Sequence, residues 1–226
     1  MQKYFYYINI TLAIIFLCSC NTTKQLTSNR KKSEVNRLLI LPPITEISII
    51  NKGNNLEKSF TFSKEAAKEI TNQVKNIIPD SIKFSQLITD TAQFQEIFKS
   101  VSGIIKIVEQ RRTIKGIIIP AILLHLLDST NQDFCLGIWE IGFTRTTDNY
   151  VKQYQKSRIV QVATLGGLNY VPNKSYSIMI CFIIDRKNKN LAFYRKSRWR
   201  ERDPIEKMVI RSQLHDLIMR YFQSAR

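Results

Sequence analysis

Residues 176–184 read Tyr-Ser-Ile-Met-Ile-Cys-Phe-Ile-Ile and form a long strand-like run. Successive side chains of a strand point to opposite faces, so Ile178, Ile180 and Phe182 fall on one face and Met179 and Cys181 on the other. Both faces of this strand are therefore apolar. A strand of this kind is typical of a sheet that is covered on both sides.

Upstream of this strand, short strand-like and helical patterns alternate. Residues 38–41 are a Leu-Leu-Ile-Leu run stopped by Pro42 and Pro43, and residues 47–50 indicate a second extended piece. Apolar residues recur at helical spacing over residues 62–77, followed by a strand-like segment at 81–87. A further helix is expected from a capping box at Asp90 to Gly103, then helical segments at 104–112 and near Pro120.

The second half of the chain is dominated by extended patterns. Residues 134–144 are strand-like, 147–149 suit a turn, and 159–165 form another extended candidate, which Gly166 and Gly167 end. Residues 185–190 suit a hairpin turn into 191–196, and Asp203 with Pro204 marks the start of a last helix. The sequence thus predicts an α/β fold: a single mixed-sheet sandwich with alternating β/α units first, then an antiparallel meander and a C-terminal helix.

The composition of the chain excludes several classes of protein. The chain has 226 residues, is 44% hydrophobic and carries 34 Lys and Arg against 18 Asp and Glu, a net charge of +16. This apolar content excludes a collagen-like or largely disordered chain. Four cysteines are too few for a fold built on disulfides, and no apolar run is long enough for a polytopic membrane protein.

The first twenty residues have the pattern of a bacterial export signal. Lys3 precedes an apolar stretch at 8–17, and the segment ends in Leu17, Cys18, Ser19 and Cys20. This ending resembles the lipobox of bacterial lipoproteins, with Cys18 departing from the usual small residue. The resemblance implies lipidation of Cys20, including a fatty acid such as palmitate. The alternative is an ordinary signal or an uncleaved anchor with an incidental cysteine.

The lipobox also predicts the division and the location of the chain. Residues 1–19 would be a signal peptide, 20–36 the lipidated cysteine with a flexible polar tether, and 37–226 a single α/β domain. The family's sorting pattern, with Asn21 after the lipidated cysteine, implies the outer membrane of a cell envelope. No acidic export run follows Cys20, so we expect the body to face the periplasm.

No catalytic, metal or cofactor motif stands out. Cys135 and Cys181 lie in apolar runs and are expected to be buried thiols rather than a disulfide, although an oxidising compartment would permit pairing. The polar and aromatic group Arg145, Asn149 and Tyr150 follows a strand end. These three residues either line a site or cap the sheet.

The strongest charged feature is the basic run from Arg186 to Arg202. On a strand, Lys196, Arg198 and Arg200 share one face. They are candidates for binding an anionic envelope component or an acidic protein surface, and the alternative is a solvated edge strand that resists aggregation. The export signal argues against nucleic acid as the partner.

The order of elements as a whole resembles bacterial envelope lipoproteins related to CsgG and to the amino-terminal domain of TolB. The local motif is the Leu-Leu-Ile-Leu-Pro-Pro run, and no site residue transfers from it. The resemblance implies a lipid-anchored binding or assembly module without a catalytic motif. A membrane-tethered enzyme with a site near Arg145, Asn149 and Tyr150, and a purely structural lipoprotein, are the alternatives. Oligomeric state is left open.

Overall fold

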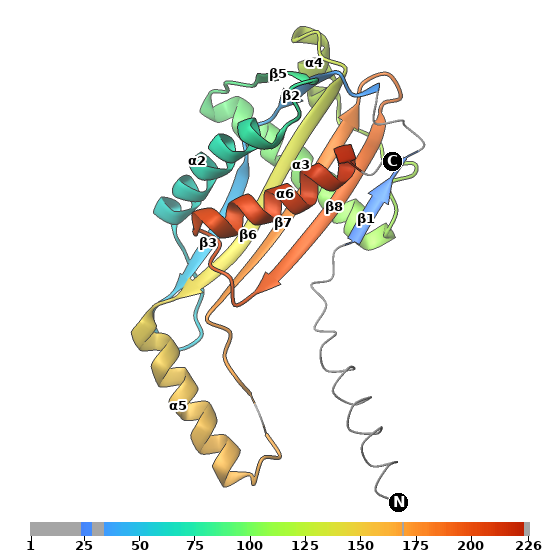
Figure 1. Ribbon diagram of the computed structural model, residues 1–226. Coiled ribbons are helices and arrows are strands. Elements are labelled where there is room, and N and C mark those ends of the chain that lie inside the picture. Colours follow the sequence, from blue (N-terminus) through green and yellow to red (C-terminus); the bar gives the residue numbers. More distant parts are fainter. Residues whose placement is uncertain (1–23, 29–33, 169, 224–226) are drawn as a thin grey trace, which may run out of the picture.

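A computed structural model describes residues 24–28, 34–168 and 170–223. Its centre is one eight-stranded sheet with the path β1-β8-β7-β6-β2-β5, to which β3 adds beside β6 and β4 beside β3 (Figure 1). The strands are β1 (Lys24–Thr27), β2 (Arg37–Ile40), β3 (Ile44–Ile50), β4 (Glu57–Lys58), β5 (Lys83–Gln86), β6 (Phe134–Arg145), β7 (Ser175–Asp185) and β8 (Asn190–Arg200).

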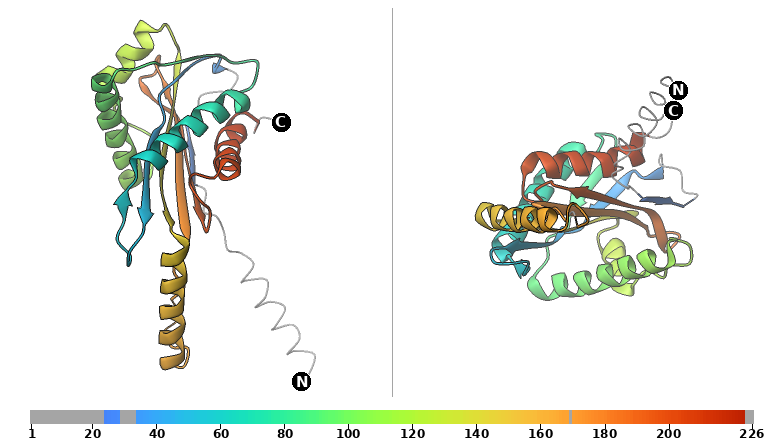
Figure 2. Two further views of the ribbon diagram at one scale, coloured as in Figure 1. Left: turned by 90° about the vertical axis from the view of Figure 1, so that its left-hand side faces the viewer. Right: turned by 90° about the horizontal axis from the view of Figure 1, so that it is seen from below.

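The sheet is mixed because β6 has different neighbours on its two sides. It pairs in parallel with β2 and β3 and antiparallel with β7. Helices α2 (Phe60–Ile77) and α6 (Lys207–Gln223) pack on one face, while α3 (Thr91–Arg111) and α4 (Ala121–Ser129) pack on the other (Figure 2). This arrangement confirms the predicted single mixed-sheet α/β fold.

Strand β7 is buried on both faces, as its sequence predicts. Met179 and Cys181 belong to the core under α2 and α6, and Ile180 and Phe182 to the core under α3 and α4. Phe182 lies directly across from Gly137 of β6, where an added Cβ would come within 2.0 Å of the Phe182 ring. The glycine therefore makes room for this ring.

Two prolines separate β2 from β3, and both strands pair with β6. Leu39 of β2 is paired with Cys135, and Ile44 of β3 with Trp139. Pro42 and Pro43, between the two strands, have no N–H to give to a ladder. The two extended pieces predicted here are both present.

Four local predictions differ from the structure. Helix α3 continues through Gly103 without a break, so this glycine does not end it. Residues Lys24–Thr27, placed by the sequence in a flexible tether, form the edge strand β1 against β8. Helix α6 begins at Lys207, and Asp203 instead bonds the backbone N–H of Ile205 in a preceding turn. The fourth difference is the largest and concerns α5.

Helix α5 (Thr147–Ala163) replaces both the turn predicted at 147–149 and the extended segment predicted at 159–165. Ile159, Val160 and Val162 are β-branched, which favours a strand when no other signal is present. The strand predicted at 159–165 is therefore wrong: the chain leaves the sheet at the end of β6, forms α5 and returns as β7. The predicted antiparallel meander is confirmed, and its strands are β6, β7 and β8.

Candidate functional site

The segment from Thr147 to Lys174 forms an arm that projects beyond one end of the sheet (Figures 1 and 2). We call this segment, without residue 169, the arm. Its helix α5 has 17 residues, which at about 1.5 Å per residue gives a length of about 25 Å. Asn149, in the first turn, is the buried residue of this helix. The arm therefore touches the body mainly at its base.

Arg145 fastens the base of the arm. Its Nε donates to the carbonyl of Asn173 at 2.8 Å, its Nη1 to Asn149 Oδ1 at 2.8 Å, and its Nη2 to Asn54 Oδ1 at 2.9 Å. A fourth bond runs from Nη1 to the carbonyl of Gly53 at 3.3 Å, which also accepts from Asn149 Nδ2 at 3.0 Å. The guanidinium thus joins the end of β6, both ends of the arm and the loop after β3.

These bonds bear on the predicted site of Arg145, Asn149 and Tyr150. The structure brings Arg145 and Asn149 into contact, whereas Tyr150 stacks on Tyr154 with ring centroids 6.2 Å apart. Because four bonds to protein atoms occupy the Arg145 side chain, its geometry is that of a structural clasp. These bonds use four of the five N–H donors of the side chain, which is itself buried.

The far end of the arm is apolar and exposed. Ile159 is 68% exposed, Val162 73% and Leu165 98%. Leu165 also has a left-handed backbone, with φ of 49°, and Gly166 follows with φ of 84° and closes the helix by a bond to the carbonyl of Gln161. These exposed side chains make little contact with the body, and a left-handed backbone is unfavourable for a leucine.

The exposed apolar side chains of Ile159, Val160 and Val162 form one broad face at the far end of the helix. At about 100° per residue, these three side chains fall within a sector of about 160°. Nearer the base, helix α5 is basic, because it carries Lys152, Lys156 and Arg158. Its one acidic residue is Asp148, in the first turn. The arm therefore has a basic shaft and an apolar tip.

The three basic residues predicted to share one face of β8 have different surroundings in the structure: Lys196 is paired, whereas Arg198 and Arg200 are exposed. Lys196 forms an ion pair with Glu109 of α3, and Glu109 also accepts a bond from the Tyr194 hydroxyl at 2.6 Å. Burial and this carboxylate raise the pKa of Tyr194. Arg198 lies over the ring of Tyr176, 5.8 Å from its centroid, and is exposed, as is Arg200. Anion binding by these residues stays a prediction, with Arg198 and Arg200 as its available members.

A polar cluster that the sequence does not reveal lies under α6. The Ser177 hydroxyl is 3.1 Å from Glu140 Oε1 and 2.8 Å from Gln213 Oε1, and all three residues are buried. Burial is the main cause that raises the pKa of Glu140 to about 8, and the nearby charge of Asp203 adds to it. The sequence feature that could have indicated this cluster is Glu140 itself, a carboxylate in the middle of an apolar strand.

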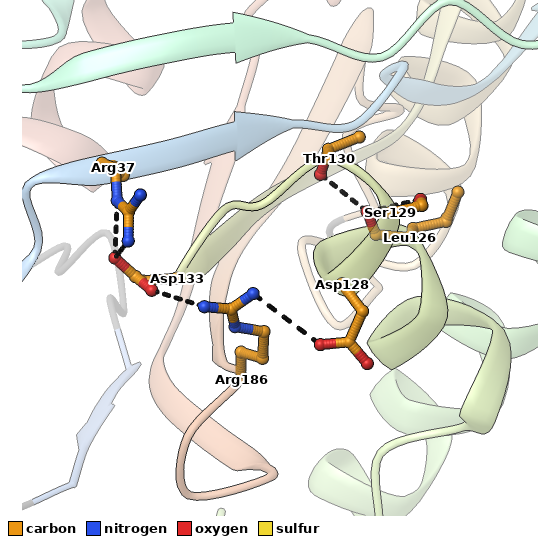
Figure 3. Close-up of polar contacts among 7 residues, drawn as sticks. All are labelled: Arg37, Leu126, Asp128, Ser129, Thr130, Asp133 and Arg186. Carbon is orange, nitrogen blue, oxygen red and sulfur yellow. Dashed lines mark hydrogen bonds and ion pairs between the residues drawn. The ribbon is translucent and has the colours of Figure 1, made fainter.

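Ion pairs fasten the opposite end of the sheet. Asp133 accepts from Arg37 and from Arg186, each at 2.8 Å, and Arg186 lies 3.7 Å from Asp128 (Figure 3). The cluster joins the start of β2, the start of β6 and the hairpin between β7 and β8. Since each arginine faces a carboxylate, this cluster is another structural fastening.

The two cysteines of the body cannot pair in this fold. Cys135 and Cys181 are free and buried, and they point to opposite faces of the sheet. Burial raises the pKa of both thiols, that of Cys181 to about 12. Within the described ranges no group of three or more His, Cys, Asp or Glu residues is placed to hold a metal ion. None of the helices described there has the length and apolarity to cross a membrane.

Comparisons with known proteins give only distant structural similarity. No family model and no curated protein matches the chain. PelC from Paraburkholderia phytofirmans, solved as a dodecamer, has 9% identity and a TM-score of 0.40 over 87% of this chain and 96% of its own. A DUF4136 family protein from Bacteroides thetaiotaomicron has 8% identity and a TM-score of 0.33, over 90% of this chain and 98% of its own. Similarities of this size carry no conclusion about function.

Proposed function

We propose that this chain is a lipid-anchored binding or assembly module of a bacterial cell envelope, held at the outer membrane by Cys20 and facing the periplasm. The observation that supports it best is the arm, whose basic shaft and exposed apolar tip suit contact with the anionic surface of the anchoring membrane. Cys20 lies outside the described residues, so its lipidation rests on the sequence.

The direction of β1 supports this orientation. Lys24 is paired with Lys196, and Thr27 with Phe193, so the chain enters β1 from the end of the sheet at which the arm projects. The four residue steps from Cys20 to Lys24 span at most about 14 Å. From Lys196 to the end of β8 at Arg200 is about 13 Å. An anchor on Cys20 would therefore hold the membrane no farther than roughly the end of the sheet.

The arm extends beyond that point. Its helix adds about 25 Å past the end of β6, more than a short tether can compensate. An anchored chain would thus bring the arm into the membrane plane, either along it or into the headgroup layer. The exposed apolar side chains of Ile159, Val160 and Val162 suit this environment, because the membrane interface buries the apolar face of a helix.

Two experiments test the two halves of this proposal. Labelling with a radioactive fatty acid should mark the wild type and not Cys20→Ala, and equal labelling of both would end the lipoprotein interpretation. For the arm, a triple variant with Ile159→Ser, Val162→Ser and Leu165→Ser should bind anionic vesicles at least several-fold more weakly at unchanged thermal stability. A triple variant that binds like the wild type would overturn the role of the arm and leave the anchor untouched.

A further inference from the structure

An apolar groove runs along the outer edge of β3, between helices that lie on opposite faces of the sheet. Its volume is about 760 Å³, within the range of small-ligand sites. The floor is formed by the segment from Pro42 to Ile47, one wall by α2 including Ala67, and the other by α3 including Phe94 and Phe98. Phe60 stands at the margin of the groove with 83% of its surface exposed.

The rim of the groove is basic. Lys58, Lys64 and Lys68 line it, and its one acidic residue is Glu46, 4.0 Å from Lys58. Lys64 and Lys68 lie one turn apart on α2, so their ammonium groups can reach the same point. In the part of the chain that the structure describes, no carboxylate lies within ion-pair distance of either. Two neighbouring cations thus border an apolar surface.

The edge of β3 is poorly suited to an added peptide strand. The carbonyl of Ile47 accepts from the Ser59 N–H at 2.9 Å, and the N–H of Ile47 donates to Ser63 Oγ at 3.0 Å. Pro42 and Pro43, at the other end of the floor, have no N–H to offer. Strand addition depends on main-chain hydrogen bonds, so an occupant of this groove would be held by side chains instead.

We propose that the groove binds a single-chain anionic amphiphile, either a fatty acid or a lysophospholipid. The acyl chain would lie over Ile44, Ala67 and Phe98, and the carboxylate or phosphate would accept bonds from Lys64 and Lys68. The lysine stems can cover apolar surface while the ammonium groups stay in water, which suits a ligand with the same division. This inference goes beyond the proposed function and does not depend on it.

The test is a titration with cis-parinaric acid, a fluorescent fatty acid, on the full chain with all variants prepared alike. We expect saturable binding that Ala67→Trp, which fills the groove, weakens at least tenfold. The double variant Lys64→Gln/Lys68→Gln should weaken it several-fold. Lys75→Gln, on the same helix but outside the groove, should bind like the wild type.

Competition then identifies the head group. Palmitate and lysophosphatidate should displace the probe, and the stronger competitor shows whether carboxylate or phosphate is preferred, while neutral monopalmitin should compete poorly. Lys64 and Lys68 are exposed, so we expect their double variant to fold. It therefore tests the proposal even if Ala67→Trp fails to fold. Undiminished binding by the double variant, or equal competition by monopalmitin, would overturn the proposal.

Discussion

The buried carboxyl of Glu140 allows a quantitative test of the fold. Burial raises its pKa from an ordinary value of 4.5 to about 8, so the folded protein retains a proton that the unfolded chain has released between these values. In that window the free energy of unfolding decreases by up to about 1.4 kcal/mol for each pH unit as the pH rises. At pH 7 the accumulated loss is of the order of 3 kcal/mol.

Replacing Glu140 with Gln removes the titrating group and keeps its shape. We expect Glu140→Gln to gain stability relative to the wild type as pH rises from 5 to 8, at about 1 kcal/mol per unit. The assay is urea unfolding followed by circular dichroism at several pH values. Glu65→Gln, at an exposed position of α2, is the control and should follow the wild type. Parallel curves for wild type and Glu140→Gln would refute the assignment of a buried, protonated carboxyl.

Three further predictions concern packing, the arm and the thiols. Gly137→Ala would place a methyl group 2.0 Å from the Phe182 ring, so urea unfolding should show a loss of about 1–3 kcal/mol, partly restored by the added change Phe182→Leu. Arg145→Gln should speed limited trypsin cleavage within the arm several-fold while the rest of the chain stays intact, and equal rates would argue against the clasp. Cys135 and Cys181 should react with maleimide only after unfolding, and an oxidised form with altered mobility on non-reducing gels would contradict their placement.

The sheet could be predicted because its strands carry their own signal. The run 176–184 is apolar on both faces, and burial of both faces follows from that pattern alone. For helix α3 the sequence predicts two pieces, because Gly103 has the pattern of a helix end. Gly in a helix costs only about 1 kcal/mol, which the buried Ile97, Val101 and Ile104 readily offset by packing on both sides of it.

The arm could not be predicted in the same way. Core contacts impose helical periodicity on a sequence, and α5 makes almost none, so its β-branched residues indicated a strand. Part of the contact network of Arg145 can be predicted from the sequence, because Arg145 and Asn149 are four residues apart. Their partners Gly53 and Asn54 lie 91 to 96 residues away, and no local pattern connects them. The buried contacts of Glu140 with Ser177 and Gln213 likewise arise only from the tertiary fold.

The proposed contact of the arm's tip with the membrane can be measured with an environment-sensitive fluorophore at position 165. The lipidated full chain would carry Leu165→Cys labelled with a nitrobenzoxadiazole dye in vesicles containing anionic lipid, since Cys135 and Cys181 are buried. Lys187→Cys, exposed in the hairpin at the opposite end of the sheet, is the matched control. We expect a blue shift and protection from an aqueous quencher at position 165 only. Equal quenching at both positions would show that the tip of the arm stays in water and would contradict membrane contact.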